Sequence, residues 1–221
     1  MSALQSAYPE PEHNCTLCPR LHDFLQTWRI AEPSWHNAPV APFSPIGGLD
    51  KTRLLIVGLA PGVRGANRTG RPFTGDYAGE LLYATLKEFG FAQGTFEARP
   101  DDSLQLRETA IVNAVRCVPP QNKPVGQEIN TCRRFFAPLL QDLPDLHAVV
   151  TLGSIAHQST VRALGGKVAR HPFGHNRHTD IGNLRIFSSY HCSRYNTNTG
   201  VLTTAMFQDV FRAVRAYLDS L

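Results

Sequence analysis

The chain has 221 residues, of which 42% are hydrophobic and 18% are charged, and its net charge is +4 at pH 7. These values are typical of one globular domain with a single sizeable core, and they exclude a chain that is disordered along its whole length. Because segment 1–15 lacks a basic region followed by an apolar stretch, and no apolar run reaches the roughly 18 residues of a membrane span, we expect a cytoplasmic protein without membrane contact.

Residues 1–50 are rich in proline and show helical character only at 21–29, so we expect an irregular N-terminal segment within one domain spanning 1–221. Four apolar runs predict buried strands, at 53–58, 109–115, 148–153 and 184–190. Apolar residues that recur with helical spacing predict further helices, at 78–89, 126–140, 155–164 and 203–218. Strands that alternate with helices indicate an α/β fold, here a three-layer sandwich with a mostly parallel four-stranded sheet and helices on both faces.

Each predicted strand is followed by a polar or glycine-rich segment, at 58–76, 116–124, 153–154 and 191–199. Folds of this class bind ligands beyond the carboxyl ends of the strands, so these segments are expected to meet at one edge of the sheet. The first of them, GLAPGVRGANRTGRPFTGD, combines glycines, arginines and one acid, Asp76. It contains neither the dinucleotide fingerprint nor the P-loop spacing, which argues against simple pyrophosphate capture.

Four cysteines have a spacing that suits a metal centre. Cys15 and Cys18 form a C-x-x-C pair, whereas Cys117 and Cys132 stand alone further along the chain. Four thiolates can hold either a structural zinc ion or an iron–sulfur cluster, and the spacing does not choose between them. Four unrelated cysteines are the alternative, and a disulfide framework is not expected in the cytoplasm. Cys192 is interpreted as a small packing residue.

Four ordered motifs resemble those of the iron–sulfur uracil-DNA glycosylases. They are G-L-A-P-G, N-R-T-G-R-P-F-T-G-D, V-R-C-V-P-P-Q-N-K-P and S-Y-H-C-S-R-Y-N-T-N-T-G. The resemblance runs from Cys15 to the last predicted helix, and Leu59, at a position where family 4 carries a glutamate, favours family 5. It implies hydrolysis of the N-glycosidic bond of uracil in DNA during repair, with other deaminated bases such as hypoxanthine as further candidates. It also implies a structural 4Fe–4S cluster held by the four cysteines.

The resemblance and the chemistry together suggest three catalytic residues. Asp76 is the candidate for orienting the attacking water or balancing charge on the sugar, and Asn122 for sharing that water. His191 is the candidate for hydrogen-bonding the base oxygen that gathers negative charge as the bond breaks. The alternatives are an N-cap for Asp76, an ordinary turn residue for Asn122, and a surface or capping histidine for His191.

Three further residues are candidates for holding the base. Phe73 would stack on it, main-chain amides near Gly62 would approach it closely, and the amide of Asn113 would pair with the uracil edge. The alternatives are a core aromatic residue for Phe73 and a buried asparagine with backbone partners for Asn113. Residues 171–178 contain three histidines, and we interpret them as a basic loop in preference to a metal site.

DNA is the expected partner, and a monomer is the expected state. Basic residues near the proposed pocket are predicted to contact phosphates: Arg64, Arg68, Arg71, Arg116, Lys123 and Arg194. Tyr195 and Asn196 are predicted to enter the duplex or its minor groove. Two alternative functions stay open, a non-catalytic iron–sulfur module that binds DNA and a strictly uracil-specific enzyme like those of family 4.

Overall fold

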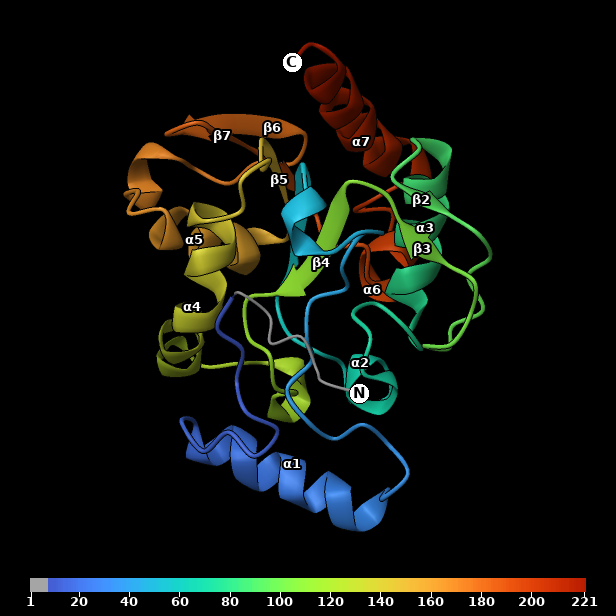
Figure 1. Ribbon diagram of the computed structural model, residues 1–221, viewed down its shortest axis with the longest axis vertical. Helices are drawn as coiled ribbons and strands as arrows, with labels where there is room; N and C mark the ends of the chain where they lie inside the picture. Colours follow the sequence, from blue (N-terminus) through green and yellow to red (C-terminus); the bar gives the residue numbers. More distant parts are fainter. Residues whose placement is uncertain (1–7) are drawn as a thin grey trace.

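A computed structural model describes residues 8–221, so the first seven residues of the expected domain lie outside the described part. Its centre is a five-stranded sheet with strand order β4-β1-β5-β7-β6 (Figure 1). The strands are β1 (Leu54–Gly58), β4 (Thr109–Asn113), β5 (Ala148–Leu152), β6 (Arg177–Ile181) and β7 (Leu184–Ser189). Neighbouring strands run parallel except β6, which is antiparallel to β7.

Helices cover both faces of the sheet, which confirms the predicted three-layer sandwich (Figure 1). On one face lie α3 (Tyr77–Glu88) and α7 (Thr204–Asp219), and on the other α4 (Gly126–Gln141) and α5 (Ser154–Ala163). Strand β1 shows why two helical layers are needed. Its alternate residues Leu54 and Ile56 enter the first core cluster, whereas Leu55 and Val57 enter the second, and all four are fully buried.

The sheet has one strand more than predicted. Strand β6 begins inside residues 171–178, so the prediction of a loop throughout that stretch is wrong. The sequence of β6, RHTDI, has no apolar run, because the strand lies at the edge of the sheet and pairs only with β7. None of its five residues is fully buried, and therefore hydrophobic periodicity carried no signal for it.

Several short elements surround the sheet: α2 (Ala66–Thr69), α6 (Arg194–Asn198), a hairpin of β2 (Ala92–Gln93) with β3 (Gln105–Leu106), and the 3₁₀ turns η1 (Leu49–Lys51), η2 (Pro120–Asn122) and η3 (Val168–Arg170). Helix α1 (Pro19–Ala31) lies beyond the carboxyl ends of the strands (Figure 1). Its Leu21 and Leu25 pack with Val115 and Val118 in a third core cluster, which attaches the N-terminal segment to the loop after β4. Within residues 8–221, no helix combines the length and the apolar character that crossing a bilayer requires.

Candidate active site

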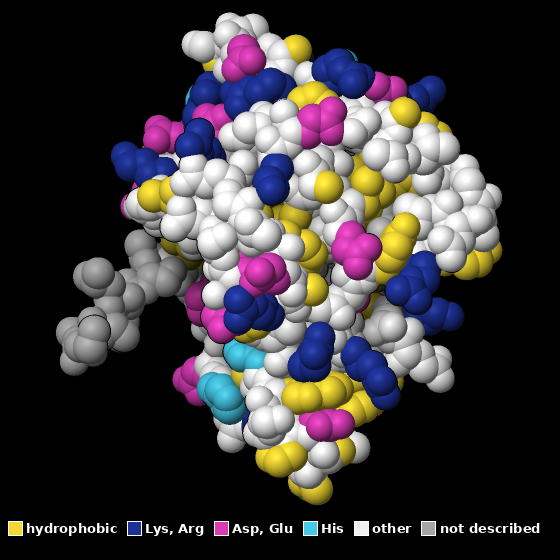
Figure 2. All heavy atoms as spheres, turned by 90° about the vertical axis from the view of Figure 1, so that its right-hand side faces the viewer, with side chains coloured by type: hydrophobic (Ala, Val, Ile, Leu, Met, Phe, Trp, Pro, Cys, Tyr) yellow, Lys and Arg dark blue, Asp and Glu magenta, His cyan; other side chains and the backbone are white. Residues whose placement is uncertain are grey.

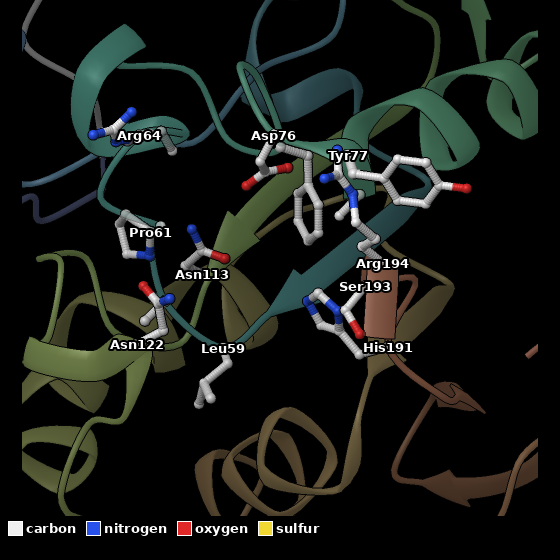
Figure 3. A pocket seen from close by; sticks show the side chains of 15 residues that line it. Leu59, Pro61, Arg64, Asp76, Tyr77, Asn113, Asn122, His191, Ser193 and Arg194 are labelled. Carbon is white, nitrogen blue, oxygen red and sulfur yellow. The ribbon is translucent and has the colours of Figure 1, made fainter. Parts of the chain in front are cut away.

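A pocket of about 670 Å³ opens at the carboxyl ends of β1 and β4, beside the segment that follows β7 (Figure 3). Its wall includes all six residues proposed for catalysis or base binding: Gly62, Phe73, Asp76, Asn113, Asn122 and His191. These residues belong to segments that are far apart in the sequence. Parallel strands place the segments at one edge of the sheet, as their position after the strands predicts.

Phe73 belongs to the core and to the pocket at once. It is 7% exposed and packs in the first core cluster, while part of its ring borders the pocket. The ring lies beside that of His191, with 5.9 Å between centroids and 29° between planes. Gly58, at the end of β1, has no side chain beneath the ring, and a Cβ there would lie 2.8 Å from it. The pocket therefore has an aromatic wall that depends on a glycine.

His191 follows β7 and is closely surrounded, although part of its surface opens to the pocket. Desolvation by these surroundings lowers the pKa of His191 to about 4. The Nδ2 group of Asn196 donates a hydrogen bond to the carbonyl of His191 at 2.8 Å, which holds the main chain in place. At neutral pH the imidazole is therefore neutral, with one N–H to donate and no charge.

Asp76 lies on the exposed wall of the pocket, yet neighbouring main chain crowds its carboxylate. A Cβ on Gly65 would lie 2.5 Å from Oδ2 of Asp76, and one on Gly62 would lie 3.4 Å from the same oxygen. Desolvation raises the pKa of Asp76, and the nearby amides of Gly79 and Ala78 partly oppose this rise. Asp76 stands at the N-cap position of α3, where these two amides lie in the first turn, but its side chain forms no cap hydrogen bond of normal geometry.

Two asparagines complete the polar wall. Asn113 ends β4 and is 4% exposed, and its Oδ1 lies so close to Gly58 that a Cβ there would be 2.3 Å away. Asn122 ends η2 and has an exposed side chain and a φ of 56°, a conformation that residues with a Cβ rarely adopt. Figure 3 shows both amides directed into the space that Asp76 and His191 also face. Residues with a positive φ, such as Asn122, concentrate at functional sites.

Cationic side chains lie on and near the wall of the pocket. Arg64, Arg68, Lys123 and Arg194 are exposed, and Arg64 and Arg194 line the pocket itself. The guanidinium of Arg194 lies over the ring of Tyr77, 5.2 Å from its centroid. The face in Figure 2 shows basic side chains interspersed with acidic and apolar ones.

Two arginines expected at this rim are buried instead. Arg71 is 6% exposed and pairs with Asp102 at 2.7 Å, and Arg116 is fully buried and pairs with Glu10 at 2.7 Å. The prediction that they contact phosphates from the rim is therefore wrong. Their acidic partners lie in distant segments, so the local sequence gave no sign that these two guanidinium groups would be enclosed.

Tyr195 and Asn196, both on α6, differ in their accessibility. Tyr195 is 73% exposed, whereas the side chain of Asn196 turns back to the main chain of His191. Asn196 is thus engaged inside the protein and does not project like its neighbour. Sequence reasoning missed Tyr77 and Ser193 as lining residues, although both stand next to residues that it identified, Asp76 and Arg194.

The four cysteines line one small cavity together with apolar side chains of the third core cluster. This cavity is bordered by Cys15, Cys18, Cys117 and Cys132. Burial raises the pKa of the Cys132 thiol to about 11 and also raises the pKa of the Cys117 thiol. Charge repulsion from the other cysteines at this cavity raises both pKa values further. Across residues 8–221, no three His, Cys, Asp or Glu side chains are already spaced to hold a metal ion. Cys192 is fully buried in the first core cluster, which confirms it as a packing residue.

Residues 45–215 match the family described as the uracil DNA glycosylase superfamily. A type-5 uracil-DNA glycosylase of Thermus thermophilus is 41% identical over 207 residues, covering 89% of this chain and 90% of the relative. A type-5 uracil-DNA glycosylase of Pyrobaculum aerophilum is 34% identical, covering 92% and 88%. A type-4 uracil-DNA glycosylase of Thermotoga maritima is 30% identical over a shorter stretch, covering 76% and 78%. The chain belongs to the uracil DNA glycosylase superfamily, and its similarity to type-5 members extends over nearly its whole length.

Proposed function

We propose that this protein is a DNA repair glycosylase, which hydrolyses the N-glycosidic bond of uracil in DNA and leaves an abasic site. The observation that carries the proposal is the pocket, where an aromatic ring, a neutral imidazole, a carboxylate and two amides face one space. Each of these groups has a task in breaking such a bond. The relatives named type-5 uracil-DNA glycosylase support the same activity.

The base would be held between a hydrophobic wall and a polar one. A glycosylase extrudes its target nucleotide from the stack at a cost of a few kcal/mol, which the pocket must offset. The ring of Phe73 offers a stacking surface, and the buried amide of Asn113 offers a donor and an acceptor to the uracil edge. Main chain near Gly62 would close the pocket, since a glycine lets backbone amides approach the base.

His191 would stabilise the departing base. Negative charge gathers on the uracil oxygens as the bond to the sugar breaks, and a donor aimed at that charge lowers the barrier. A pKa of about 4 keeps His191 neutral, so it would donate a hydrogen bond without transferring a proton. This arrangement suits a leaving group that departs as an anion.

Asp76 and Asn122 would position the water that attacks the sugar. A raised pKa makes the Asp76 carboxylate a stronger base than an ordinary aspartate, provided that it is ionised. Its negative charge would also stabilise the oxocarbenium-like sugar of the transition state. The exposed amide of Asn122 borders the same space and offers a second partner to that water.

DNA would approach across the exposed cations. Arg64, Arg68, Lys123 and Arg194 are exposed and would meet phosphates, contacts that orient the duplex without reading its sequence. Tyr195 projects beside the pocket and would fill the space left by the extruded base. We further propose that the protein acts as a monomer in the cytoplasm.

We also propose that the four cysteines hold a 4Fe–4S cluster, with a structural zinc ion as the alternative. Four thiols that share one cavity have the donor chemistry that either group requires. Thiolates enclosed together in one largely apolar cavity would lose hydration and repel one another, and a bound metal centre would offset that cost. Because hydrolysis transfers no electrons, the role would be to join the N-terminal segment to α4. Analysis for iron, acid-labile sulfide and zinc separates the two groups.

The activity is tested by single-turnover excision from a uracil-containing oligonucleotide, with abasic sites revealed by alkaline cleavage. We expect product from the wild type and a rate lower by about 10²- to 10⁴-fold for Asp76→Ala, the usual contribution of a positioned base. Glu80→Ala is the matched control, because Glu80 is an exposed acid in the first turn of α3. DNA binding without any product from the wild type would instead favour a non-catalytic DNA-binding module.

We propose that the range of bases extends beyond uracil, to hypoxanthine and other deaminated bases. Leu59 lines the pocket where family 4 carries a glutamate, and an apolar group there restricts the base less strictly. The same assay on a hypoxanthine-containing oligonucleotide tests the proposal. Excision of uracil alone would identify a strictly uracil-specific enzyme.

A further inference from the structure

Phe73 adopts a backbone conformation that its own chemistry disfavours. Its φ is 52°, in the left-handed region that residues with a Cβ rarely occupy. Such a conformation persists only where the surroundings impose it. The space around Phe73 is also filled, because a Cβ on Gly79 would lie 1.9 Å from the carbonyl oxygen of Phe73. Something must therefore hold the chain on both sides of this residue.

The structure shows three attachments, one for each neighbouring residue. Before Phe73, the Arg71 guanidinium donates to both oxygens of Asp102, at 2.8 and 2.7 Å. The hydroxyl of Tyr83 donates to the carbonyl of Pro72 at 2.5 Å. After Phe73, the Oγ1 of Thr74 accepts a hydrogen bond from Nε of Arg71 at 2.8 Å. Arg71 thus reaches across Phe73 and fastens the chain on both sides.

The Arg71–Asp102 pair is closed off from water. The side chains of Arg71 and Asp102 are 7% and 0% exposed. The guanidinium of Arg71 also lies over three aromatic rings, with 5.1, 5.8 and 5.9 Å to the centroids of Phe43, Tyr83 and Phe96. The planar guanidinium of Arg71 forms two parallel hydrogen bonds with the planar carboxylate of Asp102. Because both groups are enclosed by other side chains, the relative orientation of the pair is more closely defined than that of an exposed pair.

Asp102 comes from the loop between β2 and β3, far from the catalytic segments in sequence. It accepts hydrogen bonds from the amides of Glu97 and Leu104, each at 3.0 Å, so its own position is fixed. Although burial opposes ionisation, the donors from Arg71 and these two amides hold the pKa of Asp102 at about 2. The carboxylate is therefore ionised at neutral pH.

Stability alone does not account for this arrangement. A buried ion pair stabilises a fold no better than well-packed apolar side chains of the same volume, because both charges lose their hydration. What the pair adds is a defined position for Arg71. Because Arg71 also bonds to Thr74, this fixes the main chain on both sides of Phe73. The ring of Phe73 is the part of this segment that borders the pocket.

We propose that Arg71 and Asp102 are positioning residues, which hold the Phe73 ring as the stacking wall of the base pocket and so determine how firmly the extruded base is bound. The inference rests on the proposed function, because it takes the base to be the ligand of this wall. It assigns no chemical step to either residue. It connects the β2–β3 loop to substrate binding, although that loop contributes nothing to the pocket lining.

Two adjacent aspartates provide a matched test. Asp102→Asn removes the charge of the buried partner, whereas Asp101→Asn makes the same change one residue away, where the side chain is 73% exposed. Each variant is titrated with an oligonucleotide carrying 2′-fluoro-2′-deoxyuridine, which resists cleavage, and with the same sequence carrying a tetrahydrofuran abasic site. For Asp102→Asn we expect about tenfold weaker binding of the uracil probe, the factor for weakening one stack of base on aromatic ring, and unchanged binding of the abasic probe. Asp101→Asn should match the wild type on both.

A general structural role would reduce both affinities together, and unchanged binding of the uracil probe would also overturn the proposal. Arg71→Lys, which keeps the charge but loses the fork, should reproduce the selective loss if Asp102→Asn folds poorly. A crystal structure of either variant gives a readout that does not depend on activity, since Phe73 should leave the left-handed region. Failure of the wild type to release uracil would refute the proposed function, while that structural comparison would still decide the positioning role.

Discussion

Replacing Gly65 by alanine would press a methyl group against the carboxylate of Asp76. The added Cβ would lie 2.5 Å from Oδ2, 3.1 Å from Cγ and 3.3 Å from Cβ of that residue. Real Cβ contacts of 2.5 Å essentially do not occur, so either the carboxylate or the start of α2 has to move. The nearest contact is with the oxygen atom proposed to hold the attacking water.

The size of the effect follows from this displacement. To reach an ordinary van der Waals distance the oxygen has to retreat by about 1 Å, and an error of that size in a reacting group costs about 10²-fold in rate. This factor corresponds to about 2.7 kcal/mol of transition-state stabilisation. Because Asp76 is proposed to act on water and not on the base, affinity for a non-cleavable uracil probe should stay the same.

Single-turnover excision by Gly65→Ala, compared with Gly126→Ala, measures the effect. Gly126 begins α4 and has open space around its Cβ position, so the same substitution there should leave the rate unchanged. Thermal unfolding of both variants shows whether each is folded at the assay temperature. A wild-type rate for Gly65→Ala would refute the role of Asp76 in positioning water, as would equal losses in rate and in probe affinity.

Four further expectations concern pH, the cysteines and salt. The single-turnover rate should fall in acid as Asp76 gains a proton at its raised pKa. The rate should show no step near pH 6.5, because such a step would mean that the pKa of His191 is not lowered. Between pH 6.5 and about 4, His191 binds a proton in the unfolded chain but not in the folded chain. The free energy of unfolding should therefore decrease as pH falls through that window. In the variant His191→Gln this decrease should be smaller. Cys117→Ala should lower the melting temperature and the metal content before it lowers the rate at a temperature where the protein is folded, and a stable but inactive variant would contradict a structural centre. In a plot of log affinity against log salt, Arg64→Ala should reduce the slope for DNA binding by about one, whereas Arg212→Ala on α7 should leave it unchanged.

The sequence predicted the regular part of the fold because burial leaves a local pattern there. The runs that became β1, β4 and β5 are buried along their whole length, β7 is buried except at Arg185, and the predicted helices begin and end within a few residues of those observed. Strand β6 left no such pattern, because an edge strand whose residues are all partly exposed can be polar throughout.

The pocket was predictable for a different reason, since position after a parallel strand already implies one edge of the sheet. Phe73, Asp76, Asn122 and His191 meet there for that reason. What the sequence did not reveal is which arginines stay at the surface. Arg71 finds its partner 31 positions away, and only the folded chain brings the two together. The same limit applies to the contact of Gly65 with Asp76, which depends on the path of the loop between β1 and α3.

The ion pair of Glu10 with Arg116 joins groups 106 positions apart, and this separation determines when the N-terminal segment can dock during synthesis. As the chain leaves the ribosome, its first cysteine pair must wait undocked until the strand preceding Arg116 has been made and placed. A shortened protein that begins after Glu10 would leave a guanidinium in a dry interior without its counter-charge, a loss of about 3–5 kcal/mol. The opening stretch of the chain is thus synthesised first but can form this ion pair only after Arg116 has been made.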